Sequence, residues 1–111
     1  MKTFPEAGDI IEIDFDPQAG KEIQKRRPAL VLSEKAINQA TGFVWACPIT
    51  STASKHLLQV DLPSGLAVFG TVKIEQMKSM DFVARNGVCK GTVSASFLSR
   101  CRGLAKKVLG D

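Results

Sequence analysis

The spacing of hydrophobic and polar residues predicts mostly short β-strands. Apolar and polar positions alternate from Asp9 to Phe15, as in a strand with one buried face. An apolar run after Pro28 predicts a buried strand, and FVWACPIT at positions 43–50 is typical of another strand. Further β segments are predicted at 57–62 and 66–80, on either side of a Pro-Ser-Gly turn, and one more at 87–93.

Two segments follow a helical pattern instead. Residues 34–40 predict one or two helical turns, with Ser33 as the N-cap and Gly42 at the end. Near the C-terminus, apolar residues recur at steps of four and three: Phe97, Cys101, Leu104 and Val108. This spacing predicts a helix with one apolar face, capped by Ser94 or Ser96. Short strands followed by a terminal helix predict a small, curled antiparallel sheet or barrel, and residues 1–111 are expected to form a single domain.

Composition and charge narrow the functional classes. The chain has 111 residues, of which 44% are hydrophobic and 23% charged, an ordinary globular composition. A net charge of +4 favours polyanionic partners such as nucleic acid, an anionic membrane surface or an acidic peptide. No apolar run has the length of a signal peptide core or of a membrane span, so a cytoplasmic location is expected. Three widely spaced cysteines indicate reduced, buried thiols, and no metal or cofactor is expected.

The basic residues between Lys21 and Arg27 stand directly before the buried strand. Pro28 disfavours a helical backbone at Arg27, so this residue is expected to be held extended where an exposed connection, 18–27, meets the strand. A guanidinium fixed at that point can form paired hydrogen bonds to a phosphate or a carboxylate. The alternative that composition alone favours is a structural salt bridge.

Four segments together resemble a known family. Residues 8–33 read GDIIEIDFDPQAGKEIQKRRPALVLS, and ACPITS stands at 46–51. Residues 72–85 read VKIEQMKSMDFVAR, and KGTVS at 90–94 leads into the terminal helix. In this order, the segments resemble the MazF, Kid and PemK group of bacterial toxin endoribonucleases. The matched features are the Asp-Pro-x-x-Gly turn, the Arg-Pro pair, the Pro-x-Thr strand end and the acidic-Gln-x-basic-Ser segment, which together span nearly the whole chain.

The resemblance implies a mainly β fold, an SH3-like barrel of the CcdB, MazF and PemK type with a short inserted helix and a C-terminal helix. It also implies a homodimer that binds single-stranded RNA along a groove between the subunits. The implied activity is metal-independent, sequence-specific cleavage of mRNA, leaving 2′,3′-cyclic phosphate and 5′-OH ends. A cognate, MazE-like antitoxin with an acidic, flexible tail is expected to occupy the same groove.

The resemblance also implies the catalytic residues. Arg27 matches the family's catalytic arginine, and Thr50 matches the catalytic threonine of Pro-x-Thr. Glu75 stands where Kid-like members carry the general base, and Lys73 stands where they carry the acid. Two residues apart on a strand, these side chains would face the same side. An exposed ion pair without a catalytic role is the alternative for Glu75 and Lys73.

Six further residues are expected to contact RNA: Glu22, Lys25, Arg26, Ser51, Gln76 and Lys78. The segment IQKR between Glu22 and Arg27 is bulkier and more basic than in the family, which predicts an altered base preference or antitoxin pairing. His56, the single histidine, matches no family motif and is expected to be exposed. Phe43 and Trp45 are expected to pack in the core or in a dimer interface.

Two other functions compete with RNA cleavage. CcdB-type proteins share the implied fold and bind DNA gyrase, so the same barrel can serve as a protein-binding module. An SH3-like adaptor for nucleic acid or protein would also account for the positive charge. Neither role requires the pairing of Arg27 with Thr50.

Overall fold

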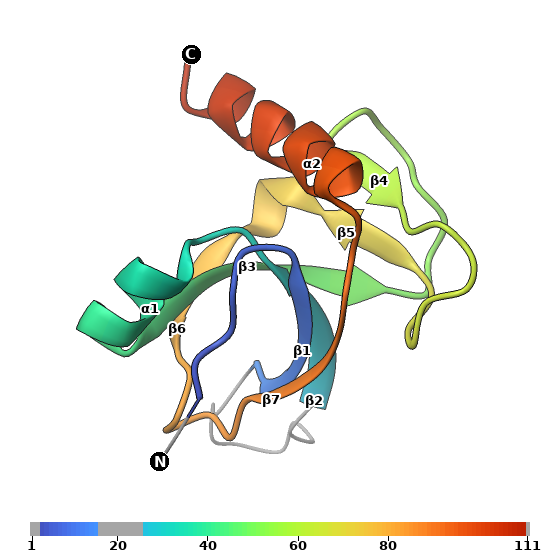
Figure 1. Ribbon diagram of the computed structural model, residues 1–111. Coiled ribbons are helices and arrows are strands. Elements are labelled where there is room, and N and C mark those ends of the chain that lie inside the picture. The colour runs from blue at the N-terminus through green and yellow to red at the C-terminus, as the bar shows by residue number, and fades with distance from the viewer. Residues whose placement is uncertain (1–2, 16–25, 111) are drawn as a thin grey trace, which may run out of the picture.

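The computed structural model describes residues 3–15 and 26–110. Within them, seven antiparallel strands form a curled sheet, with a short helix at its side and a longer C-terminal helix across one end (Figure 1). The elements are β1 Asp9–Asp14, β2 Arg26–Val31, α1 Lys35–Thr41, β3 Phe43–Thr50, β4 Gln59–Asp61, β5 Thr71–Lys73, the 3₁₀ turn η1 Ile74–Gln76, β6 Lys78–Asp81, β7 Val88–Thr92 and α2 Ala95–Val108. The predicted mainly β architecture with an inserted helix and a terminal helix is confirmed.

Strand β3 is the centre of the sheet. The order of strands is β4, β5, β3, β2, β1, β7, and β6 also pairs with β3. One edge of β3 is divided between two partners, because Phe43 to Ala46 pair with β6 and Ile49 and Thr50 pair with β5. Between these two pairings stands Pro48, which has no N–H to donate. The break in pairing lies beside η1, which joins β5 to β6.

Alternation along the central strands separates two hydrophobic clusters. The first is packed under α2 and contains Leu30 and Leu32 of β2 and its continuation, together with Cys47, Phe97 and Cys101. The second lies on the opposite face of β2 and β3 and is made of Ile11, Ile13, Phe15, Ala29, Val31, Val44, Ala46, Met80 and Phe82. Both faces of β2 and β3 are therefore covered, which explains the uninterrupted apolar sequence of β2.

The helix ends agree with the sequence in part. Gly42 ends α1 in the left-handed conformation, with φ of 81°, and the Ser94 hydroxyl caps α2 by accepting from the Phe97 N–H. The prediction that Ser33 caps α1 is wrong, since Glu34 is the N-cap residue. The Ser33 hydroxyl instead donates to the Asn38 Oδ1 atom and accepts from the N–H of Trp45 in β3.

Three other expectations need correction. The segment 66–80 is not one strand, because it contains β5, η1 and the start of β6. Cys89 is exposed, whereas Cys47 and Cys101 are buried as expected. Phe43 is exposed and Trp45 is half-buried, so neither belongs to the core of the single chain, and their place in a dimer interface stays a prediction. No helix within the described residues has the length and apolar character needed to span a membrane.

Candidate active site

The register of β2 and β3 places Arg27 across from Thr50. Ala29 pairs with Pro48, and the same register continued by two residues sets Arg27 opposite Thr50. Regular pairing stops before that point, because Pro28 brings no N–H to the next position. By alternation, Arg27 lies on the face of Ala29, and Thr50 on the face of Pro48. Both side chains therefore extend beyond the end of the second hydrophobic cluster.

A polar hollow of about 230 Å³ lies at this point. It is lined by Phe15, Arg27, Pro48, Thr50, Lys73 and Gln76. Two cations, a hydroxyl and an amide thus converge from β2, β3, β5 and η1, and no carboxylate is among these lining residues. Such a set of donors favours an anionic ligand, and a phosphodiester matches it in charge and hydrogen bonding.

Thr50 and Arg27 keep their donors available in this hollow. The Thr50 Oγ1 atom is buried and has no hydrogen-bond partner among the described residues. A buried hydroxyl without a partner is costly, and a ligand oxygen would satisfy it. No hydrogen bond or ion pair joins the Arg27 guanidinium to another residue in 3–15 or 26–110. The salt bridge considered for Arg27 is therefore not found in that part of the chain.

Lys73 and Glu75 do not lie side by side on a strand. Lys73 is the last residue of β5, whereas Glu75 belongs to the 3₁₀ turn η1, so the alternation expected of a strand does not apply. Lys73 lines the hollow and Glu75 does not. The Glu75 carboxylate instead accepts a hydrogen bond of 2.9 Å from Gln59 Nε2 and lies 3.7 Å from His56 Nε2.

The surroundings of Glu75 determine its ionisation. Burial raises the pKa of this carboxyl, but the hydrogen bond from Gln59 and the charges of His56 and Lys73 outweigh burial, and its pKa lies below the ordinary value. Glu75 is therefore an ionised group beside the hollow at neutral pH. Sequence reasoning gave His56 no role and did not single out Gln59, because their distance from Glu75 along the chain hides the contact.

The predicted RNA-contacting residues are distributed unevenly. Gln76 lines the hollow, and exposed Ser51 directly follows Thr50. The Lys78 ammonium lies 5.7 Å from the centre of the Phe15 ring. Arg26 contacts Asp14 at 3.2 Å and Glu12 at 3.7 Å, so its guanidinium already has protein partners. The remaining two predictions, Glu22 and Lys25, lie outside the described residues.

Phe15 and Pro48 line the hollow, and sequence reasoning did not single them out. Phe15 is held in place from the turn before β7: the Arg85 guanidinium donates to the carbonyls of Asp14 and Phe15. The Asn86 side chain donates to the Asp14 carboxylate, which lowers the pKa of that group. The end of β1 is thus fixed where it forms a wall of the hollow.

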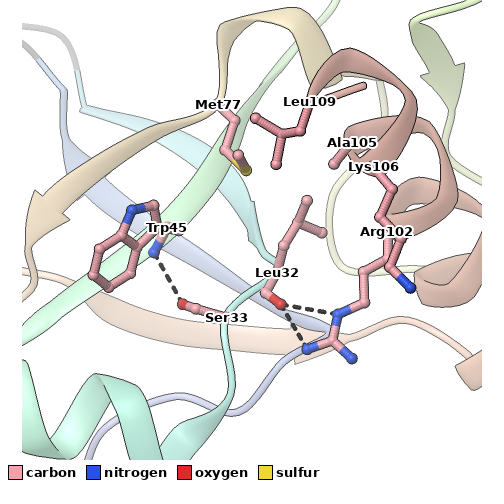
Figure 2. Close-up of a pocket in the computed structure, with 8 residues that line it drawn as sticks. All are labelled: Leu32, Ser33, Trp45, Met77, Arg102, Ala105, Lys106 and Leu109. Atoms are coloured by element: carbon pink, nitrogen blue, oxygen red, sulfur yellow. Dashed lines mark hydrogen bonds between the residues drawn. The ribbon is translucent and has the colours of Figure 1, made fainter. Parts of the chain in front are cut away.

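A second hollow, of about 330 Å³, lies between β3 and α2. Figure 2 shows its lining residues: Leu32, Ser33, Trp45, Met77, Arg102, Ala105, Lys106 and Leu109. Its walls are mostly apolar, and its arginine has protein partners. Arg102 Nε and Nη2 donate to the Leu32 carbonyl at 3.0 and 2.7 Å, and Nη2 also reaches the Glu34 carboxylate at 3.3 Å.

Known proteins are similar to this protein over nearly the whole chain. Residues 6–109 match the model of a family described as a PemK-like, MazF-like toxin of type II toxin–antitoxin systems. The endoribonuclease toxin MazF of Escherichia coli strain K12 is 35% identical over 109 residues, covering 98% of this chain and 97% of the relative. The E. coli endoribonuclease PemK is 30% identical over 112 residues, covering 97% and 84%.

Solved structures of MazF proteins are also similar to this chain over nearly its whole length. The crystal structure of MazF (Form-I) from Deinococcus radiodurans is 40% identical, with a TM-score of 0.86 over 96% of this chain and 97% of that chain. The MazE–MazF crystal structure (Form-II) from the same organism is 40% identical, with a TM-score of 0.89 over 96% of both chains. The predicted SH3-like barrel of the MazF and PemK type is thereby confirmed.

Proposed function

This chain belongs to the family of PemK-like, MazF-like toxins of type II toxin–antitoxin systems, and we propose that it is an endoribonuclease that cleaves single-stranded RNA at specific sequences without a metal ion. The observation that carries the proposal is the meeting of Arg27, Thr50 and Lys73 in one polar hollow. These residues come from three strands, and none of them belongs to either hydrophobic cluster. A phosphodiester would occupy the donors that they leave available.

The proposed reaction uses the ribose 2′-OH as the nucleophile. Its oxygen forms a bond to phosphorus while the bond from phosphorus to the 5′-oxygen breaks. A general base takes the 2′ proton and a general acid gives a proton to the 5′-oxygen, so the products are a 2′,3′-cyclic phosphate and a 5′-OH. The protein must also stabilise the added negative charge on the phosphoryl oxygens.

Arg27 and Thr50 are proposed to stabilise that charge. A guanidinium keeps its proton at all working pH values, which suits charge stabilisation better than proton transfer. The Thr50 hydroxyl, buried and without a partner in the described chain, would donate to a phosphoryl oxygen. Ser51, the next residue, is proposed as an auxiliary donor.

Glu75 and Lys73 are proposed as base and acid. Glu75 is ionised at neutral pH, as a base must be before it accepts a proton, and this supports the first role. Its neighbour Gln76 lines the hollow, so the base would act from the rim. Lys73 lines the hollow directly and would protonate the 5′-oxygen.

RNA outside the cleaved bond is proposed to contact the surrounding polar residues. Gln76 would bind a base edge, and Lys78 and Arg26 would contact phosphates. Arg26 would do so at the expense of its contacts with Asp14 and Glu12. Glu22 and Lys25 stay as predicted contacts from the preceding segment.

We also propose two protein partners. A cognate acidic antitoxin is supported by the net charge of +4 and by the similar MazE–MazF crystal structures from Deinococcus radiodurans. A homodimer is supported by large apolar side chains that are exposed in the single chain, including Leu109, Val108 and Phe69. Cytoplasmic mRNA would be the target of such a toxin.

The decisive test is incubation of the pure protein with RNA of mixed sequence in EDTA. Discrete cuts that end in 2′,3′-cyclic phosphate would support the proposal. Intact RNA together with tight binding of DNA gyrase would instead support a CcdB-like role. Sedimentation at micromolar concentration tests the homodimer, and a strict monomer would contradict a groove shared between subunits.

A further inference from the structure

Beside the polar hollow, a buried amide joins the loop that follows Thr50 to the turn that contributes Gln76 to the hollow. Gln59, the first residue of β4, is 7% exposed. Its Oε1 atom accepts from the Lys55 N–H at 3.0 Å, and its Nε2 atom donates to Glu75 Oε2 at 2.9 Å. Both ends of the side-chain amide are therefore used, one on the loop 51–58 and the other on η1.

These contacts act on segments adjacent to the proposed catalytic residues. The loop 51–58 starts directly after Thr50, and Glu75 stands between Lys73 and Gln76, which line the hollow. The backbone of Gln59 also pairs with Lys73 in the β4–β5 ladder, and the Ile74 N–H donates to the Leu58 carbonyl at 2.9 Å. The amide of Gln59 thus connects the loop that follows Thr50 to η1, which contributes Gln76 to the hollow.

His56 approaches the same carboxylate from the loop. Its Nδ1 atom accepts from the Leu58 N–H at 3.3 Å, and its Nε2 atom lies 3.7 Å from Glu75 Oε2. The groups that face Glu75 are therefore Gln59 from β4, His56 from the loop and Lys73 from β5, and all three favour its ionised form.

Building on the function proposed above, we propose that Gln59 is a positioning residue for RNA cleavage, which holds the Glu75 carboxylate and the loop after Thr50 in one arrangement. A buried amide that served stability alone could be satisfied by any polar groups. Here one partner is the carboxylate proposed to accept the 2′ proton, and the other belongs to the loop that leaves the Thr50 strand end. Misplacement of either group would slow the chemical step more than RNA binding.

The first experiment compares wild-type protein with Gln59→Met, which keeps the length of the side chain and removes both hydrogen bonds. We expect the rate constant of cleavage under single-turnover conditions to fall about tenfold or more, with little change in the steady-state KM. We also expect the acidic limb of the pH–rate profile to move to higher pH, because Glu75 loses its main donor. Gln39→Met, on the exposed surface of α1, is the matched control and should cleave at the wild-type rate.

The second experiment exchanges the amide of Gln59 and the carboxylate of Glu75. Gln59→Glu alone sets two carboxylates against each other and should lower Tm. The double variant Gln59→Glu with Glu75→Gln restores a hydrogen bond of reversed direction, so Tm should recover while cleavage stays slow, because the carboxylate has moved.

The outcomes separate the two proposals. Equal kcat and pH profiles for wild-type and Gln59→Met, or full recovery of cleavage in the double variant, would overturn the positioning role while RNA cleavage by the wild type stands. Failure of the wild type to cleave RNA would refute the proposed function, and the role of Gln59 with it.

Discussion

The two hollows of this molecule each contain an arginine, and the two arginines are used in opposite ways. In the apolar hollow under α2, Arg102 donates to the Leu32 carbonyl (Figure 2). It also donates to the Glu34 carboxylate. In the polar hollow, Arg27 has no acceptor among the described residues and stands across from the buried hydroxyl of Thr50. One guanidinium holds a helix on a barrel, and the other is available to an anionic ligand. The residue type does not distinguish these two roles, because both residues are arginines. The hydrogen-bond partners of each guanidinium do.

The strongest test of this comparison is Arg27→Ala. We expect single-turnover cleavage to fall about a thousandfold, because the added charge on phosphorus loses its main partner. Thermal stability should change little, since Arg27 makes no hydrogen bond to the described part of the protein. Arg100→Ala, which removes an exposed arginine of α2, is the control and should retain activity. Loss of folding in Arg27→Ala would show that its role is structural.

Thr50→Val tests the same hollow at the position of the unpartnered hydroxyl. We expect cleavage to fall about a hundredfold, since a donor to the phosphoryl oxygen is removed. The free energy of unfolding should stay equal or rise, because a buried polar atom without a partner is replaced by a methyl group of the same size.

The matched control for Thr50 is Thr41→Val. The Thr41 hydroxyl donates to the Ile37 carbonyl and accepts from the Phe43 N–H. Its removal should lower Tm and leave the rate of cleavage by folded protein unchanged. A loss of stability in Thr50→Val as large as that in Thr41→Val would contradict the view that the Thr50 hydroxyl is reserved for a ligand.

Arg102→Met tests the apolar hollow. It keeps much of the apolar stem but leaves the Leu32 carbonyl without its two donors, so we expect a loss of about 1–3 kcal/mol in the free energy of unfolding. Denaturant unfolding measures that loss. The rate of cleavage per folded molecule should not change, and a selective loss of cleavage with unchanged stability would reverse the comparison.

Much of this arrangement follows from local sequence patterns. The sequence predicts β1, β2 and β3 correctly, because each of these strands buries a regular pattern of residues. The patterns are the alternation before Phe15, the apolar run of β2 and the segment 43–50 of β3. The convergence of Arg27 and Thr50 was expected only through the family resemblance. In the structure it follows from the β2–β3 register, which no single segment encodes.

The errors arose where backbone geometry depends on tertiary contacts. The segment from Thr71 to Asp81 contains enough β-branched and apolar residues to predict a strand, but η1 interrupts it where β3 exchanges one partner for another. That turn takes Glu75 out of the strand, and its carboxylate accepts a hydrogen bond from Gln59. The contact joins residues 16 positions apart in sequence, and periodicity carries no information about such a pair.

The smallest expected effect concerns acid stability beside the polar hollow. The pKa of Glu75 is lowered in the folded protein, so its contacts with Gln59 and His56 stabilise the fold above about pH 4.3, the ordinary value for a glutamate. This contribution is lost as pH falls through the folded pKa, because the carboxyl then takes up a proton. Asp14 has a lowered pKa as well, so acid sensitivity of the wild type alone would not identify the group.

Comparison with Glu75→Gln isolates the contribution of this carboxylate. Between pH 7 and pH 3.5, Tm should fall more in the wild type than in the variant, by less than about 4 °C, the shift that 1 kcal/mol produces in a domain of this size. Thr41→Val should lower Tm to a similar extent at both pH values, because the Thr41 hydroxyl contacts backbone groups that do not titrate. Equal acid sensitivity of wild type and Glu75→Gln would mean that Gln59 and His56 do not favour the ionised carboxylate of Glu75.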